Sequence, residues 1–285
     1  MREITVATTQ MACSRDRDDN VAKAISLVRR ARAAGADLVL LQELFETPYF
    51  CQEQDATHFA LAHDAQDSPL LARMRALAAE LGVVLPVSFF ERSRNSHFNS
   101  LAMIDADGSL LGIYRKSHIP QGPGYEEKFY FTPGDTGFRV WRTRIGVVGA
   151  GICWDQWFPE AARAMALAGA EILCFPSAIG SEPQDPGLDS RAHWRRVMQG
   201  HAAANMLPLV ASNRIGTERG AGGELHFYGN SFIADVTGDI VASAGAHDEA
   251  VVLASFDLDA CRARRIGWGL YRDRRPDLYG PLLAH

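Results

Sequence analysis

A cysteine stands in this sequence where a nucleophile would be expected. Residues 145–152 form an apolar run of strand character that leads into Cys153, and Pro159 and Glu160 follow in the pattern of a helix start. A turn from strand to helix displays a side chain at a sheet edge, near helix amides whose dipoles favour a thiolate. A cysteine is more often a buried core residue, so Cys153 needs chemical companions to count as a nucleophile.

Two ionisable residues end other apolar segments in the same manner. Glu43 follows the run at 38–41, and Lys116 follows the run at 110–114. Taken singly, each is more often a solvated surface charge than a catalytic group. Ends of separate strands are, however, the usual places from which a sheet builds a site. With Cys153, the two residues therefore predict an active site that combines a thiol, a carboxylate and an ammonium.

These segments together resemble the nitrilase or carbon-nitrogen hydrolase superfamily, and the similarity covers nearly the whole chain. The resemblance implies an α/β (α+β) fold, a four-layer αββα sandwich of two mixed β-sheets with helices outside. It also implies catalysis with no metal and no other cofactor, and assembly into homo-oligomers. The motifs that carry it are Leu41-Gln42-Glu43, Tyr114-Arg115-Lys116-Ser117-His118-Ile119-Pro120, and Gly151-Ile152-Cys153-Trp154-Asp155 with Pro159-Glu160.

The family resemblance also points to a second glutamate and gives each group a role. We place this glutamate at Glu127, with the adjacent Glu126 as the alternative. Lys116 is expected to stabilise the oxyanion and to lower the thiol pKa of Cys153, while Glu43 takes the thiol proton and later activates water. Glu127 is expected to hold Lys116 in place. Two carboxylates buried beside one ammonium should show coupled, shifted titrations.

The residues after the cysteine indicate the charge of the substrate. Family members that act on carboxylated ureido compounds resemble one another in having arginines shortly after the nucleophile, and residues 154–158 contain none. Tryptophans and carboxylates suit a distal ammonium through cation–π contacts and ion pairs. Residues 44–46, 49–52, 178–183 and 272–276 resemble family members that hydrolyse a carbamoylated diamine. A small carbamoylated amine is therefore the expected substrate.

Six residues are candidates for the substrate pocket. Glu182 is the candidate partner of the distal ammonium, and a solvated loop acid is an equally good interpretation of it. Aromatic side chains would line the pocket, although aromatics are more often core, and two small residues would offer backbone contacts. The remaining candidates are Tyr49, Tyr125 and Trp154 for the lining, and Ser177 and Ala178 for the backbone.

Two alternatives to this function remain open on the sequence. The same chemistry could act on an N-carbamoyl amino acid or an ω-amide, in which case two arginines should converge opposite Cys153. A non-catalytic scaffold that keeps the fold for assembly is the alternative of another class. The intact set of Glu43, Lys116 and Cys153 speaks against a scaffold, because assembly does not require an ionisable thiol.

Composition excludes several other classes. The 285 residues are 47% hydrophobic and 22% charged, which is enough for one compact domain over 1–285. A formal charge of -5 gives no basic field, so nucleic acid is not an expected partner. The five cysteines are scattered and never spaced as C-x-x-C, and the histidines form no metal-binding motif. Neither a disulfide framework nor a metal site is therefore expected.

The segments between these residues predict mixed sheets. Strands are expected at 4–9, 37–41, 83–90, 100–104, 110–114, 138–141, 145–149, 172–175, 209–212, 231–235, 240–242 and 251–256, and helices at 20–34, 70–81, 159–169 and 189–206. Asp-Gly at 107–108 marks a hairpin turn. The helix at 189–206 is expected to take no part in catalysis.

The ends of the chain give two further expectations. The start has no apolar leader and no long uncharged apolar run follows, which predicts a cytoplasmic protein that crosses no membrane. The tail at about 267–285 is aromatic, arginine-rich and too apolar to remain uncovered. We expect this tail to pack at an interface with another subunit.

Overall fold

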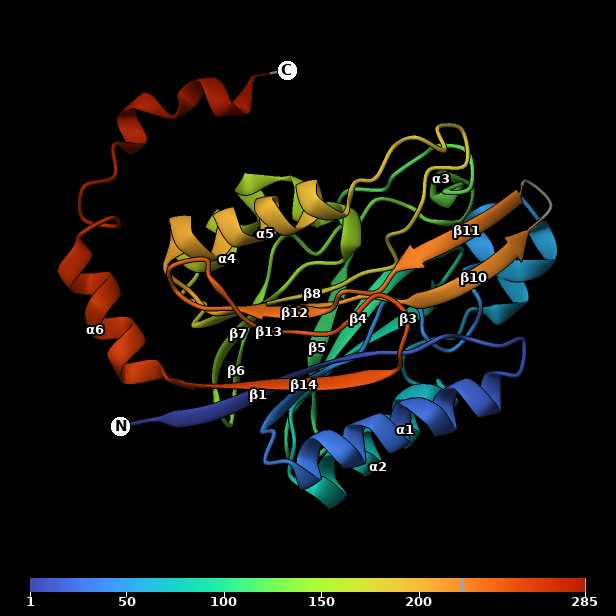
Figure 1. Cartoon of the computed structure of the whole chain (residues 1–285), viewed down its shortest axis with the longest axis horizontal. Helices are drawn as coiled ribbons and strands as arrows, with labels where there is room; N and C mark the ends of the chain where they lie inside the picture. Colours follow the sequence, from blue (N-terminus) through green and yellow to red (C-terminus); the bar gives the residue numbers. More distant parts are fainter. Residues whose placement is uncertain (221–222, 285) are drawn as a thin grey trace.

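Two β layers form the centre of the molecule (Figure 1). The structure is a computed structural model, and it describes residues 1–220 and 223–284. The first layer joins the sheets β14-β1-β2 and β3-β4-β5 through a bridge between Leu38 and Val84. The second is a six-stranded sheet of order β13-β12-β9-β8-β7-β6. The strands are β1 (Glu3–Gln10), β2 (Leu38–Leu40), β3 (Leu85–Ser93), β4 (Ser96–Ile104), β5 (Leu110–Arg115), β6 (Val140–Thr143), β7 (Gly146–Ala150), β8 (Ile172–Pro176), β9 (Leu209–Ser212), β12 (Phe232–Ala234), β13 (Ile240–Ser243) and β14 (Ala250–Asp257).

Helices cover the outer face of each layer. α1 (Arg17–Ala33) and α2 (Pro69–Leu81) pack on the first layer, and α4 (Pro159–Leu167) and α5 (Arg191–Asn205) pack on the second (Figure 1). Both layers contain parallel and antiparallel pairs: β1 is parallel to β2 and antiparallel to β14, and β7, β8 and β9 are parallel. The predicted four-layer αββα sandwich is confirmed.

Local sequence signals explain where these elements begin and end. The Ser68 side chain accepts a hydrogen bond from the Leu71 N–H, Pro69 occupies the first turn of α2, and Gly82 ends the helix in the left-handed conformation. Gly108 turns the β4–β5 hairpin with a φ of 82°, where a Cβ atom would lie 2.6 Å from the carbonyl oxygen of Arg75. The turn therefore requires glycine.

The two sheets bury an apolar core between them. Val6, Leu40, Val148, Ile172 and Val210 are all fully buried in this inner layer. This inner layer is apolar, and the charged side chains of the site lie beyond it, near the strand ends. The ends of β2, β5 and β7 supply the residues of the candidate site.

Several elements were not predicted from the sequence, among them a hairpin and a helix. A hairpin of β10 (Ile215–Gly220) and β11 (Gly223–Tyr228) projects from the second layer, and α6 (Leu258–Trp268) follows β14. The hairpin alternates exposed polar residues with few apolar ones, and α6 buries only Leu258, so neither shows a strong apolar period. Among the described residues, no helix is long and apolar enough to span a membrane.

The C-terminal segment leaves the sandwich. α6 and two short 3₁₀ turns, Pro276–Leu278 and Gly280–Leu283, curve away from the layers (Figure 1). Large apolar side chains on this segment are open to solvent in the single chain: Ile266 is 66% exposed, Trp268 68% and Leu283 88%. That the tail packs on another subunit stays a prediction.

Candidate active site

Cys153 occupies a bend between a strand and a short 3₁₀ turn. β7 ends at Ala150, the turn Cys153–Trp157 follows, and α4 begins only at Pro159. The φ of Cys153 is 41°, in the left-handed region that residues other than glycine seldom adopt. Such a conformation persists where the surroundings determine it, and it is typical of functional sites. The amides that directly follow the sulfur belong to this turn, not to α4 as the sequence suggested.

Asp155 ties this bend to the segment after Lys116. Its buried carboxylate accepts hydrogen bonds from the Ile152 N–H at 2.9 Å and from the Tyr114 hydroxyl at 2.7 Å. It also bonds the His118 backbone N–H at 3.0 Å and the Nδ1 atom of that residue at 2.8 Å. The carboxylate thus anchors both the backbone and the ring of His118. One carboxylate fixes the position of the cysteine relative to the lysine segment.

Three charged side chains meet in the interior beside this bend. Lys116 Nζ donates to Oε1 of Glu43 at 2.9 Å and to Oε2 of Glu127 at 2.6 Å, and the three side chains are at most 1% exposed. Glu127 is the first residue of the short helix α3 (Glu127–Tyr130). Glu126 is half-buried and bonds Gln54 instead. The geometry therefore brings Glu127, and not Glu126, to the lysine.

The cluster holds two carboxylates for one ammonium, and this balance shifts pKa values. Burial alone lowers the pKa of Lys116, but the charges of Glu127 and Glu43 outweigh it and hold that pKa well above its ordinary value. Burial, followed by Glu43, raises the pKa of Cys153 far above that of a free thiol. Lys116 does act to lower the thiol pKa, as expected, but its effect is outweighed. Cys153 thus lies close to ion-paired carboxylates, in surroundings that favour its neutral thiol.

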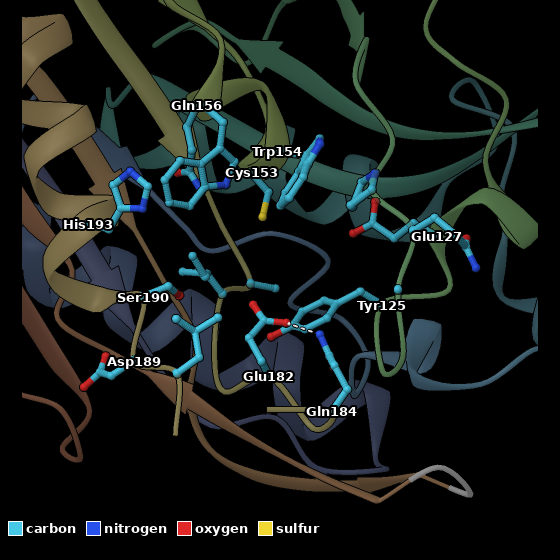
Figure 2. Close-up of a pocket in the computed structure, with 17 residues that line it drawn as sticks. Tyr125, Glu127, Cys153, Trp154, Gln156, Glu182, Gln184, Asp189, Ser190 and His193 are labelled. Carbon is cyan, nitrogen blue, oxygen red and sulfur yellow. Dashed lines mark hydrogen bonds between the residues drawn. The ribbon is translucent and has the colours of Figure 1, made fainter. Parts of the chain in front are cut away.

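A cavity of about 440 Å³ opens onto the sulfur. Figure 2 shows Cys153 and Glu182 facing the same opening from opposite sides. No lysine or arginine is among the described residues that line the cavity. Of the predicted site residues, the lining includes Cys153, Glu127, Tyr125, Trp154, Ala178 and Glu182.

Hydrogen bonds hold the loop that carries Glu182. The Tyr125 hydroxyl donates to the Ser181 carbonyl at 3.0 Å and accepts from the Gly180 N–H at 3.2 Å. Gln184 donates to Oε2 of Glu182 at 3.2 Å (Figure 2). The carboxylate is therefore aimed into the cavity by a tethered loop, and does not project freely into solvent.

Comparison with known proteins agrees with this geometry. Residues 5–266 match the family model described as carbon-nitrogen hydrolase. The chain belongs to the carbon-nitrogen hydrolase family. It is 62% identical over 288 aligned residues to N-carbamoylputrescine amidase from Solanum tuberosum, across 99% of this chain and 96% of that protein. It is 51% identical to citrullinase from Francisella tularensis, across 99% of each. The crystal structure of a carbon-nitrogen hydrolase from Helicobacter pylori G27 has a TM-score of 0.91 at 40% identity, with 99% of both chains covered.

Two predicted pocket residues of this hydrolase lie behind the cavity wall. Tyr49 is 1% exposed, and its hydroxyl donates to Oε1 of Glu127 at 2.7 Å. Ser177 is fully buried; its hydroxyl donates to Oε1 of Gln156 at 3.0 Å, and its carbonyl accepts the Glu43 N–H at 3.3 Å. Neither lines the cavity, so in this structure both support other residues of the site.

Several residues near the cavity were missed from the sequence. Gln156 and Trp157 line it next to the cysteine, and the start of α5 contributes His193, although this helix was assigned no role. Arg214 is fully buried after β9 and donates to the carbonyl oxygens of Glu43, Leu44 and Thr47 at 3.1, 2.8 and 2.9 Å. It thereby fixes the chain just after the first glutamate. A single arginine between two strands carries no signal of this role.

Proposed function

We propose that this hydrolase removes the carbamoyl group of N-carbamoylputrescine and releases putrescine, carbon dioxide and ammonia, a step of polyamine synthesis. The observation that carries the proposal is the cavity, which has a thiol at one side, the Glu182 carboxylate opposite it, and no lysine or arginine in its described lining. The ureido group would reach Cys153 while the ammonium pairs with Glu182. The 62% identity to an N-carbamoylputrescine amidase supports the same substrate.

The charged cluster supplies the chemistry. Oε2 of Glu43 takes the thiol proton as Cys153 Sγ attacks the carbamoyl carbon, and Lys116 stabilises the oxyanion that forms. One carbon–nitrogen bond breaks, and the proton moves from Glu43 to the leaving nitrogen. Glu43 then takes a proton from water as the water oxygen attacks the thioester-like carbon; the carbon–sulfur bond breaks, and Glu43 returns this proton to the sulfur that leaves, which restores the thiol. The carbamic acid produced loses carbon dioxide, whichever nitrogen left first. Glu127 holds Lys116 throughout.

Citrulline is the second candidate substrate, because a citrullinase is 51% identical to this chain. It differs from N-carbamoylputrescine only by a carboxylate on the carbon that bears the ammonium. A cavity that holds Glu182 and has no lysine or arginine in its described lining disfavours this extra negative charge. Substrates that end in a carboxylate, such as N-carbamoyl amino acids, are disfavoured for the same reason.

Ammonia release tests the proposal directly. We expect turnover with N-carbamoylputrescine to exceed turnover with citrulline, N-carbamoyl-β-alanine and glutamine, and Cys153→Ala to abolish it. Cys174→Ala is the matched control, since Cys174 is equally buried but does not line the cavity. Absence of turnover by the wild type, or undiminished turnover by Cys153→Ala, would refute the proposal. Turnover by the wild type would by itself also exclude a non-catalytic scaffold.

We also propose that the tail pairs with a second copy of the chain. Trp268 and Leu283 are 68% and 88% exposed on a segment that leaves the sandwich (Figure 1), and such an apolar surface is typical of an interface. Light scattering should show that Trp268→Glu lowers the molecular mass in solution. Leu111→Glu, on β5 and 36% exposed, is the control that should leave the mass unchanged. A monomeric wild type contradicts the proposal.

A further inference from the structure

Asn99 on β4 contacts two of the three charged residues beside the cysteine, Glu43 and Lys116. Its Nδ2 donates to Oε1 of Glu43 at 2.6 Å, and its backbone carbonyl accepts the main-chain N–H of Lys116 at 2.8 Å. Lys116 Nζ completes a ring by donating to the same Oε1 atom at 2.9 Å. Asn99 is fully buried, so solvent does not compete for these bonds. One residue thus holds the carboxylate by its side chain and the lysine by its backbone.

The two donors make the oxygens of Glu43 unequal. An ionised carboxylate only accepts hydrogen bonds, so the face of the amide that meets it must be the NH₂ face. Both donors end on Oε1, whereas Oε2 is buried and has no hydrogen-bond partner within residues 1–220 and 223–284. Oε2 therefore keeps the lone pairs that can receive a proton, and the carboxylate cannot rotate without breaking two bonds.

We propose that Asn99 is a positioning residue that selects Oε2 of Glu43 as the basic atom of the site. This inference rests on the role of Glu43 in the proposed function. Asn99 exchanges no proton itself; it orients the group that does. A hydrogen bond to a carboxylate also favours the ionised form, so loss of Asn99 leaves a base that is misaligned and more easily protonated. Other titratable groups that interact with Glu43 are Lys116, Glu127, Cys153, Tyr49, Cys51 and Arg214.

Two substitutions test the proposal through the pH dependence of kcat/KM for N-carbamoylputrescine. Asn99→Ala removes the donor and should lower kcat roughly ten- to hundredfold with little change in KM. It should also move the acidic limb of the profile upward by about one pH unit. Asn99→Asp has the same size but brings a second carboxyl to Glu43, and should move the limb further in the same direction.

A matched control separates positioning from general support of the fold. Asn205→Ala removes another buried asparagine, which is 2% exposed and whose Nδ2 donates to the His201 carbonyl at 2.9 Å. The Oδ1 atoms of Asn205 and Asn99 both have no hydrogen-bond partner among the described residues. Asn205→Ala should lower the melting temperature and leave the acidic limb in place. An acidic limb that stays in place in both Asn99 variants, or moves equally in the control, overturns the proposal.

Alkylation of Cys153 by iodoacetamide gives a second readout that needs no turnover. Its pH profile should shift upward in both Asn99 variants, because the same base accepts the thiol proton. If the wild type fails to hydrolyse N-carbamoylputrescine, the proposed function fails, and the alkylation profile still decides the role of Asn99. If Asn99→Ala does not fold, Asn99→Asp, which preserves the packing volume, gives the answer. An unshifted alkylation profile counts against the inference.

Discussion

Replacing Lys116 by methionine should destabilise this hydrolase, and the loss should be large. The ammonium lies 2.9 Å from Glu43 and 2.6 Å from Glu127, and all three side chains are buried. Lys116→Met keeps the chain length but leaves two buried carboxylates without a cation. Removing one partner of a buried ion pair costs about 3–5 kcal/mol. With the unfolding entropy typical of a chain of 285 residues, this corresponds to a fall in Tm of roughly 5–8 °C.

The loss of stability in Lys116→Met should grow as the pH rises. Burial already raises the pKa of Glu127, against the opposing charge of Lys116, and removal of the lysine raises it further. A carboxyl whose pKa is raised by folding contributes stability that is fully present below its unfolded pKa, roughly 4.3. That contribution disappears as the pH rises through the folded pKa. The Tm difference from the wild type should therefore be small in acid and largest at neutral pH and above.

Scanning calorimetry over this pH range measures the effect. Lys128→Met is the matched control: this lysine lies on α3 next to Glu127 but is exposed, so its loss should change Tm little. Adding Glu127→Gln to Lys116→Met removes one of the uncompensated charges and should restore part of the loss at neutral pH. A loss of the same size at every pH, or a double variant no more stable than the single one, would refute this electrostatic account.

Three further outcomes follow from the site. Glu182→Gln should raise KM for N-carbamoylputrescine about tenfold with kcat little changed, since the pair with the distal ammonium forms equally in ground and transition states; an equal rise for an uncharged carbamoylated alkylamine would contradict this. Asp155→Ala should lower Tm and kcat more than His118→Ala, as calorimetry and kinetics can show, because it removes the hydrogen bonds from Tyr114 and His118 as well as the bond within the bend from Ile152. Glu127→Gln should speed alkylation of Cys153 at neutral pH, because the negative charge of Glu127 raises the thiol pKa, even as turnover falls; slower alkylation would count against the charge balance described.

Much of the fold could be predicted because the apolar residues of its core strands and helices follow clear patterns. The segment at 83–90 is apolar except for Ser88 and that at 172–175 is apolar throughout, as expected of strands buried on both faces; β3 begins at Leu85 and β8 at Ile172. The β10–β11 hairpin and α6 were missed because they bury little, and the exposed residues that dominate them follow no apolar pattern. Their positions depend on contacts elsewhere in the molecule rather than on local sequence.

The residues of the site also differ in whether the sequence predicts them. Glu43, Lys116 and Cys153 could be predicted from the sequence because each follows an apolar run, where an ionisable side chain stands out. Asn99 could not, because it lies inside β4 and its role depends on register: Ser100 pairs with Arg115, which brings the backbone of Asn99 to Lys116. Arg214 is similar, since its three carbonyl partners lie far away in the sequence. Residues that orient catalytic groups are set by strand pairing, which the sequence does not state locally.

The raised thiol pKa is compatible with the proposed chemistry because the net charge of the cluster need not change. In the resting site, two carboxylates flank Lys116, and the raised pKa of Cys153 favours its neutral thiol. Attack moves the thiol proton to Glu43 and creates an oxyanion on the substrate, so one anion replaces another near the same ammonium. A standing thiolate would instead add a negative charge in a poorly solvated interior, where it is costly. Transfer of the thiol proton to Glu43 as the sulfur attacks therefore avoids a standing thiolate beside these carboxylates.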